Sequence, residues 1–446
     1  MPTAEVADRA GHARGRDARE AVVKRVAVTG LGVLAPNGIG TKDFMAGLCA
    51  GRSGVITSRE FDTSRLASRI YGTLPECDLP GLSVEHSTGD DRVVRIALRA
   101  AREAITSAGL LDEDIAPERM GVVMANAIGG TKFMTEHFPQ ITGGGTAAID
   151  VAAAHPRLHV AATFNRPAVA IADAHGIRGP VMTPATGCTG GNDAVGFALD
   201  TIRRGEADVM VTGAAEAPLT PFVVACFDVI GALSTRNDDP EAASRPFDAD
   251  RDGFVLGEGA GVAVLEEWGH ARRRGAPILA EVLGFGSTSN AFHMTDLDSE
   301  GKHLARSFQL ALDDARCSAT SVDYVNAHGS STPQNDVCET NAIKTVLGAH
   351  AYRTPVSSIK SMVGHALAAA NALELVACVL ALEEGVIPPT VNHHAPGDSC
   401  DLDYVPNEAR EERTKVIASL SSGFGGIHST VVLGSPRTTG SGEGGR

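Results

Sequence analysis

The chain has 446 residues, 43% of them hydrophobic and 21% charged, so it can bury a large core and is neither disordered nor fibrous. Its 39 basic and 54 acidic side chains give a formal charge of −15, which disfavours general binding to nucleic acid or to an anionic membrane. The longest apolar stretch, residues 366–382, is interrupted by Asn371 and Glu374 and is too short for a membrane span, and the first 23 residues contain no apolar signal region. We therefore expect a cytoplasmic protein that does not associate with membranes.

Two polar ends, residues 1–23 and 437–446, are predicted to be disordered tails, and between them short β-branched runs alternate with longer helical patterns. This alternation predicts an α/β fold with parallel strands. For a first half, residues 24–274, the predicted elements are a strand at 24–29, a helix at 92–109, strands at 119–125 and 180–183, a helix at 192–204 and a strand at 208–213. For a second half, residues 275–436, they are a strand at 278–285, a helix at 302–315, a strand at 322–327, helices at 336–347 and 365–384, and strands at 416–419 and 430–433.

The second series repeats the first in outline, because each contains a strand that runs into a turn of small residues and then a helix. In the first half the strand residues 181–185 lead into the turn 186–191, and in the second half 322–327 lead into 328–330. The two halves share too little sequence to prove a duplication, so their similarity is a structural hypothesis.

Nucleotide and metal sites are not expected. Gly30 and Gly32 follow the first predicted strand as in a dinucleotide-binding turn, but Pro36 stands where the phosphate-binding helix should continue. The eight cysteines are scattered without a CxxC pair, and the adjacent His393 and His394 cannot share one helix face as spaced metal ligands do. The sequence therefore predicts neither an NAD site nor a metal site.

Cys188 is the candidate nucleophile. It lies in a glycine-rich turn, Gly187 to Gly191, directly before a predicted helix, where free backbone amides and the positive helix N-terminus would lower the pKa of a thiol. The alternative is a small buried structural cysteine. The glycine-rich elbow favours the nucleophile.

Two histidines are suitable partners for such a nucleophile. His328 follows a strand and is flanked by Gly329 and hydroxylated residues, and His365 is expected to open a long apolar helix. Nearby, Lys360 precedes His365 by five residues and Glu374 follows it by nine, and these two charges either support the site or form an ordinary ion pair.

The segment 421–428 connects two predicted strands and contains three glycines, so its backbone can approach a ligand closely. A plain hairpin turn is the alternative. An amide from this segment and the amide of Cys188 would together make a two-donor oxyanion hole, as acyl transfer requires.

These motifs resemble those of the β-ketoacyl-acyl carrier protein synthases of the thiolase-like superfamily. The resemblance rests on the elbow at 186–196, the histidine motif at 326–336, the Lys/His motif at 358–365, the segments 232–238, 245–248 and 251–255, and the Gly-Phe-Gly-Gly loop. It extends over residues 24–436 with the motifs in the family's order. The implied fold is a five-layer αβαβα arrangement of two pseudo-symmetric halves, the first carrying the nucleophile and the second both histidines.

The resemblance also implies roles for individual residues. Cys188 would accept the acyl group, His328 and His365 would promote decarboxylation, and Lys360 and Glu374 would support them. The amides of Cys188 and Phe424 would form the oxyanion hole, and Ser330 and Thr332 would contact the phosphopantetheine arm of an acyl carrier protein. The implied reaction is a decarboxylative Claisen condensation with malonyl-acyl carrier protein, without a resident cofactor or metal.

The Thr-Gly-Cys-Thr elbow, and a serine rather than an aromatic residue at Ser422, are similar to ketosynthase α subunits of bacterial type II polyketide synthases. Such a subunit would form a heterodimer with a chain-length-factor-like partner, and a homodimer is the alternative. A fatty-acid elongating enzyme and a noncatalytic partner subunit remain alternative functions. Because the carrier is expected to be acidic, a local basic group must receive it, and Arg236 is the candidate.

Overall fold

The computed structural model describes residues 23–75, 91–111, 113 and 115–436. The predicted disordered tails therefore lie outside the described residues, except for Val23. No described helix is long and apolar enough to cross a membrane.

The elements of the first half, in chain order, are β1 (Val26–Ala35), β2 (Gly38–Ile39), α1 (Thr41–Cys49), β3 (Val55–Thr57), β4 (Ile70–Gly72), α3 (Arg92–Ser107), β5 (Met120–Ala125), α4 (Thr131–Thr142), α5 (Leu158–Ala161), α6 (Arg166–His175), β6 (Val181–Met182), α7 (Gly190–Arg203), β7 (Val209–Glu216), α8 (Pro221–Val229), β8 (Gly259–Glu267) and α9 (Trp268–Arg274). Those of the second half are β9 (Ala280–Ser289), α10 (Lys302–Ala315), β10 (Tyr324–Asn326), α11 (Pro333–Leu347), β11 (Val356–Ser357), α12 (Lys360–Val363), α13 (Ala368–Glu384), β12 (Val386–Ile387), β13 (Arg410–Glu411), β14 (Val416–Gly423) and β15 (Ile427–Gly434).

The two halves have the same sheet topology. The strand order β6-β5-β7-β8-β1 in the first half corresponds to β11-β10-β14-β15-β9 in the second. In each series the first two pairings are parallel and the next two antiparallel. The series join where β1 pairs antiparallel with β9. This repetition is what the structural hypothesis of two similar halves requires.

The correspondence between strands differs from the one expected from the sequence. Because β6 and β11 are the outermost strands of their halves, the counterpart of the strand before the cysteine turn is β11. The strand before His328, β10, corresponds instead to β5. The sequence comparison paired β6 with β10 and was wrong by one strand, because short apolar runs before small-residue turns look alike wherever they lie in a sheet.

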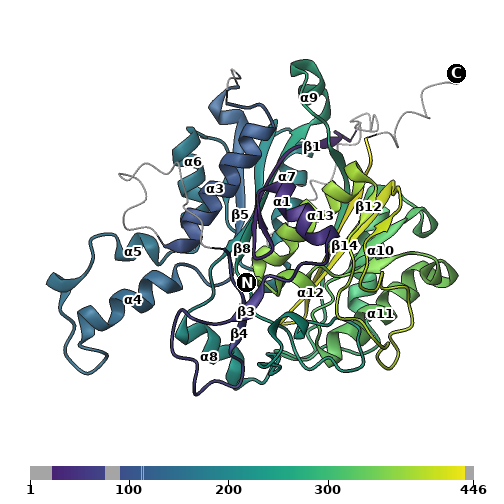
Figure 1. Cartoon of the computed structure of the whole chain (residues 1–446). Coiled ribbons are helices and arrows are strands. Elements are labelled where there is room, and N and C mark those ends of the chain that lie inside the picture. The colour runs from purple at the N-terminus through teal and green to yellow at the C-terminus, as the bar shows by residue number, and fades with distance from the viewer. Residues whose placement is uncertain (1–22, 76–90, 112, 114, 437–446) are drawn as a thin grey trace, which may run out of the picture.

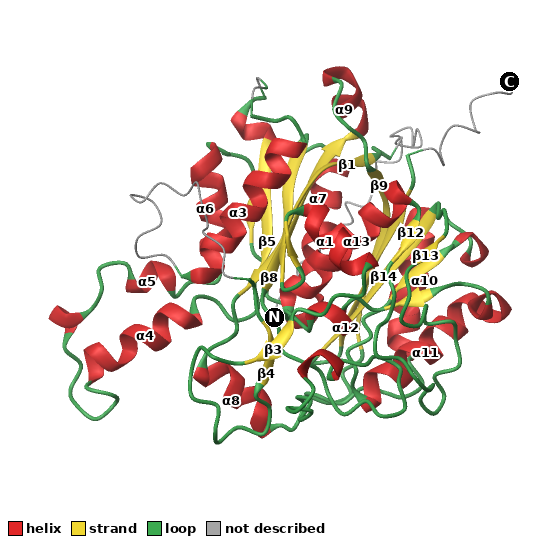
Figure 2. Cartoon of the chain, in the orientation of Figure 1, coloured by secondary structure: helices red, strands yellow, loops and turns green. Residues whose placement is uncertain are grey.

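Helices form three layers around the two sets of strands. Helices α7 and α13 lie between the sets, while α3 and α6 cover one outer face and α10 and α11 the other (Figures 1 and 2). Separate hydrophobic clusters fill the spaces beneath the two outer layers, and one large cluster surrounds the central helices. The arrangement is the five-layer αβαβα fold expected from the sequence.

The apolar stretch that is too short for a membrane span is the central helix α13, whose residues 368–381 are all buried. A helix that packs against strands on two sides needs apolar residues around its whole circumference. The expected helix start at His365 is wrong, because α13 begins at Ala368 and leaves His365 in the connection that precedes it.

Strand β1 runs beyond its predicted end at residue 29, and two glycines lie in the added part. A Cβ atom at Gly30 would lie 2.2 Å from the Ala104 carbonyl oxygen, and one at Gly32 would lie 2.0 Å from that of Ala100. Both positions lie under α3, so the apparent dinucleotide-binding turn is a strand against which a helix packs closely. The sequence patterns do not predict β8, in which Gly261 similarly admits the backbone of α13.

Candidate active site

Cys188 lies in a single 3-10 turn, Gly187–Thr189, between β6 and the start of α7. Gly187 has φ 61, a left-handed conformation that glycine adopts without strain. The hydroxyls of Thr186 and Thr189 both donate to the Asp193 carboxylate, the second at 2.7 Å, and fix the turn to the first turn of α7. The predicted elbow is therefore present.

The thiol of Cys188 is not ionised at rest. Burial raises its pKa to about 11, although Lys360 and the N–H groups of Phe424 and of Cys188 itself lower it. The expectation of a lowered pKa is wrong, because the loss of water around the sulfur outweighs the favourable charges and dipoles. Both N–H groups nevertheless lie beside the sulfur, where they are available to donate to the oxyanion of an acyl group bound to it.

His328 directly follows the short β10, and its backbone is held by a carboxylate of α11. The N–H groups of His328 and Gly329 donate to the two oxygens of Glu339 at 2.6 and 2.7 Å. Glu339 is fully buried, and burial raises its pKa to about 8 although the two amides lower it. This side chain therefore fixes the point at which the chain leaves β10.

His365 lies in the connection between α12 and α13, where it forms an isolated parallel β-bridge with Leu256. Leu367, whose φ is 48, directs its own N–H back to His365 Nδ1 at 3.1 Å. Because Nδ1 accepts this hydrogen bond, a neutral His365 carries its proton on Nε2 and can donate it to a ligand.

The two imidazole rings lie together. Their centroids are 5.2 Å apart with an interplanar angle of 80°, and each residue is only 3% exposed. Burial, and after it the positive charge of Lys360, lowers the pKa of His328 and of His365 well below the ordinary value. Both rings are therefore neutral at neutral pH and act as hydrogen-bond donors or acceptors rather than as cations.

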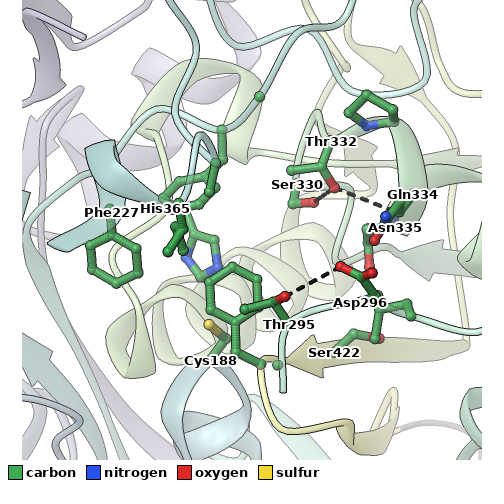
Figure 3. Close-up of a pocket in the computed structure, with 18 of the residues that line it drawn as sticks. Cys188, Phe227, Thr295, Asp296, Ser330, Thr332, Gln334, Asn335, His365 and Ser422 are labelled. Atoms are coloured by element: carbon green, nitrogen blue, oxygen red, sulfur yellow. Dashed lines mark hydrogen bonds between the residues drawn. The ribbon is translucent and has the colours of Figure 1, made fainter. Parts of the chain in front are cut away.

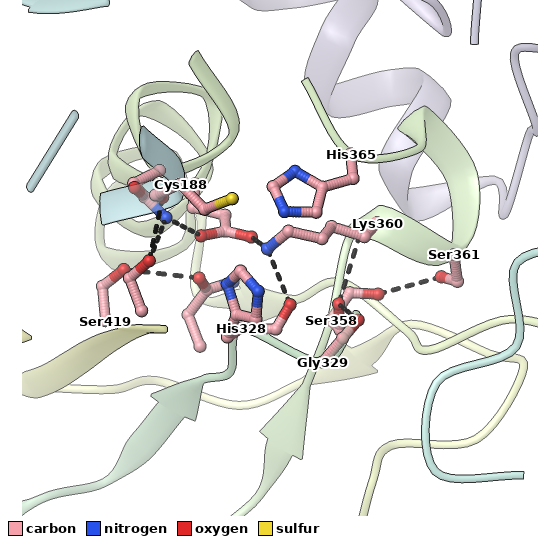
Figure 4. A network of polar contacts seen from close by, with 12 residues as sticks. Cys188, His328, Gly329, Ser358, Lys360, Ser361, His365 and Ser419 are labelled. Carbon is pink, nitrogen blue, oxygen red and sulfur yellow. Dashed lines mark hydrogen bonds and ion pairs between the residues drawn. The ribbon is translucent and has the colours of Figure 1, made fainter. Parts of the chain in front are cut away.

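Lys360 and Glu374 form a buried ion pair, which Figure 4 shows between His365 and His328. Lys360 Nζ also donates to the His328 carbonyl oxygen at 2.6 Å. Burial raises the pKa of Glu374 and Lys360 pulls it down. The ion-pair interpretation is therefore confirmed, whereas the supporting role of the two charges stays a prediction, for which the contact of Lys360 with the His328 backbone provides the geometry.

The segment 421–428 is a hairpin, because β14 runs to Gly423 and β15 begins at Ile427. The Ser421 hydroxyl donates to the Cys188 carbonyl oxygen at 3.0 Å. A Cβ atom at Gly423 would lie 3.4 Å from the Cys188 nitrogen, so the hairpin packs directly on the elbow. The hairpin interpretation and the amide-donor interpretation are thus compatible.

A cavity of about 320 Å³ joins these groups. Most of the predicted site residues line this cavity, together with residues that the sequence did not single out. The predicted residues that line it are Cys188, His328, Ser330, Thr332, His365 and Phe424. Figure 3 shows Cys188 and His365 on one side and Ser330 and Thr332 on another. The Ser330 and Thr332 hydroxyls are 2.8 Å apart.

Arg236 does not line this cavity. It is half-buried in the loop after α8, next to Thr235, whose N–H donates at 3.1 Å to Asp252 on the cavity wall. Among the described residues, no group of three or more His, Cys, Asp or Glu side chains is arranged to hold a metal ion.

Comparison with known proteins decides the family. Residues 23–271 match the model of the β-ketoacyl synthase N-terminal domain, and residues 279–394 match that of the C-terminal domain. The chain belongs to the β-ketoacyl synthase family. A putative polyketide β-ketoacyl synthase 1 of Streptomyces cyaneus is 50% identical over 93% of this synthase and 99% of the relative.

Two further similarities concern the choice between the polyketide and the fatty-acid branch of the family. The tetracenomycin polyketide synthase ketoacyl synthase α subunit of Streptomyces glaucescens is 48% identical over 93% of this chain and 98% of its own. A solved structure described as "AntDE:AntF (apo): type II PKS acyl-carrier protein in complex with its ketosynthase bound to the hexaketide" matches with a TM-score of 0.86 and 42% identity. The match covers 92% of this synthase and 99% of that chain.

Two buried polar residues of this synthase were missed as site residues. Glu339 holds the backbone at His328, and Asn371 donates to Glu374 at 3.3 Å and to Ser421 at 2.8 Å. A signal for Asn371 was available, because it and Glu374 interrupt an apolar helix at positions i and i+3, which share one face. Glu339 carried no such signal, since its helix is polar at many positions.

Proposed function

We propose that this synthase catalyses the decarboxylative condensation of an acyl group on Cys188 with a malonyl-acyl carrier protein, in type II polyketide biosynthesis. The observation that carries the proposal is a single cavity containing a cysteine sulfur, two backbone N–H groups beside it, and two neutral histidines. The high identity to polyketide ketosynthases over nearly the whole chain supports the polyketide branch.

In the first step, the sulfur of Cys188 attacks the thioester of an acyl carrier protein and the carrier thiol leaves. Because burial raises the pKa of the Cys188 thiol to about 11, the sulfur loses its proton only as the new S–C bond forms, and the leaving carrier sulfur takes up a proton. The amides of Cys188 and Phe424 stabilise the oxyanion of the tetrahedral intermediate.

In the second step, a malonyl carrier occupies the same cavity and loses carbon dioxide. A neutral His365 presents Nε2–H to the thioester oxygen, on which negative charge develops as the C–C bond to the carboxylate breaks, and His328 provides the second contact. The resulting carbon nucleophile attacks acyl-Cys188. The Cys188 sulfur leaves and takes up a proton, and the product is a β-ketoacyl carrier longer by two carbons.

The carrier supplies the phosphopantetheine arm, so we propose no resident cofactor or metal. Ser330 and Thr332 face the cavity and can donate to the polar groups of that arm. We further propose a cytoplasmic enzyme that works as a dimer, with a chain-length-factor-like subunit as the favoured partner. Solved relatives include "The ishigamide ketosynthase/chain length factor", with a TM-score of 0.85 and 35% identity.

Intact-mass measurement after incubation with an acyl-loaded carrier protein tests the proposal. We expect a mass gain of one acyl group that is lost in Cys188→Ala and kept in Cys226→Ala, whose cysteine is exposed on α8. A noncatalytic partner subunit would show no acylation. If acylation occurs, product analysis with malonyl carrier and the partner subunit distinguishes repeated extension of an unreduced chain, expected of a polyketide enzyme, from a single extension, expected of a fatty-acid enzyme whose cycle depends on separate reductases.

Carrier docking at Arg236 remains a prediction. Arg236→Glu should raise the KM for the acyl carrier several-fold without changing the rate of Cys188 alkylation by a small reagent. Arg204→Glu is the control, because Arg204 is already paired with Asp200 and Glu206 on the surface. Equal kinetics for the Arg236 variant and the wild type would remove this residue from the docking surface.

A further inference from the structure

A continuous chain of hydrogen bonds connects the nucleophile with the histidine side of the cavity. The Cys188 carbonyl oxygen accepts from the Ser421 hydroxyl at 3.0 Å, and Ser421 Oγ accepts from Asn371 Nδ2 at 2.8 Å. Asn371 Nδ2 also donates to Glu374 at 3.3 Å, and Glu374 pairs with Lys360. Lys360 in turn donates to the carbonyl oxygen of His328 (Figure 4).

The chemistry of the groups defines the direction of each bond. An ionised Glu374 only accepts, so the Asn371 amide must present its NH₂ group to it. The same NH₂ group donates to Ser421 Oγ, which leaves the Ser421 proton for the Cys188 carbonyl oxygen. The Asn371 and Ser421 side chains therefore have no freedom to reverse their roles while Glu374 is charged.

This chain of hydrogen bonds is buried and connects the two halves of the molecule. Asn371, Glu374 and Ser421 are all fully buried, so water does not compete for these bonds. Asn371 and Glu374 belong to the central helix α13, and Ser421 belongs to β14 of the second half. The elbow that carries Cys188 comes from the first half, so the chain joins the two halves at the reaction centre.

We propose that Asn371 and Ser421 are positioning residues that hold Cys188 in register with the two histidines. They act through the carbonyl group of Cys188, which limits rotation of the backbone that carries the sulfur and the oxyanion-hole N–H. A displacement of about 1 Å at a reacting atom can cost on the order of 100-fold in rate. The proposal rests on the proposed function, because it assigns Cys188 an acylation step.

The test compares two half-reactions in Asn371→Ala, Ser421→Ala and the double variant. Acylation of Cys188 by acyl carrier protein is expected to fall about 5- to 10-fold in each single variant, as for the loss of one buried hydrogen bond. Malonyl-carrier decarboxylation, which uses the histidines and not Cys188, should stay within about two-fold of the wild type in Ser421→Ala and should fall less than acylation in Asn371→Ala, which also removes a donor to Glu374. The double variant should lose little more than either single variant, because both side chains belong to one chain of bonds.

Two controls keep the result interpretable. Ser307→Ala removes a buried hydroxyl on α10 that forms hydrogen bonds with Gly286 and Thr430 and takes no part in the chain to Cys188. This variant should leave acylation unchanged. Ser421→Thr keeps the hydroxyl and should acylate faster than Ser421→Ala. Thermal unfolding of each variant verifies that the compared proteins are folded.

Three results would overturn the inference: unchanged acylation in both single variants, equal loss of both half-reactions, or additive losses in the double variant. If the wild-type protein is never acylated at Cys188, the proposed function itself is overturned. The two failures are thus distinguishable in one set of measurements.

Discussion

Replacement of Lys360 by methionine is a direct test of how the buried charges stabilise the site. Methionine keeps most of the length of the side chain but removes the ammonium group. The Lys360 and Glu374 side chains are only 2% and 0% exposed, and Lys360 Nζ also donates to the His328 carbonyl oxygen at 2.6 Å. The variant therefore leaves a buried carboxylate without its cation, which costs about 3–5 kcal/mol of folding stability.

The loss of stability depends on pH in a defined direction. Burial already raises the pKa of Glu374, and Lys360 opposes that rise, so the methionine variant has a higher folded-state pKa at this carboxyl. A carboxyl whose pKa is higher in the folded than in the unfolded state destabilises the fold as pH rises between the two values. We therefore expect the variant to be less impaired at pH 5 than at pH 8.

Urea denaturation of the wild type, Lys360→Met, Glu374→Leu and the double variant at both pH values measures these effects. The double variant should recover most of the stability, because replacing both buried charges with apolar groups removes the unpaired carboxylate. The reasoning is refuted if Lys360→Met costs less than about 1 kcal/mol at pH 8, or if its deficit grows as pH falls.

Three further outcomes follow from the geometry of the site. Alkylation of Cys188 by iodoacetamide should accelerate continuously from about pH 7 to 10, because burial raises the pKa of this thiol to about 11, and a plateau below pH 8 would contradict it. Decarboxylation of malonyl carrier by Cys188→Ala should be level between about pH 6 and 8, because the pKa values of His328 and His365 lie well below the ordinary value, whereas a fall in rate near pH 6.5 would show ordinary titration. Gly190→Ala should lower stability by about 1–3 kcal/mol in a thermal unfolding assay, since its Cβ would lie 2.9 Å from two alanine Cβ atoms, and an unchanged midpoint would show that the elbow can move away from α13.

Much of the fold could be predicted from local patterns. The helix predicted at 302–315 is α10 residue for residue, and the strand at 119–125 is β5 within one residue. Strand β8 was not predicted, because its glycines lower the local strand propensity, and one of them, Gly261, is required by close contact with α13. The correspondence of β6 with β11 also required the sheet order, which no short pattern contains.

The amino-acid sequence by itself determined where the reacting groups lie along the chain, because glycine-rich turns and strand ends are local features that short motifs record. Cys188, His328 and His365 were all located in this way, and the structure brings them to one cavity. Only the tertiary structure decided that the Cys188 thiol is protonated and that Asn371 is connected through Ser421 to the Cys188 carbonyl oxygen. The physical reason is that burial and hydrogen bonding depend on which distant segments pack over a residue, and spacing along the chain carries no record of that packing.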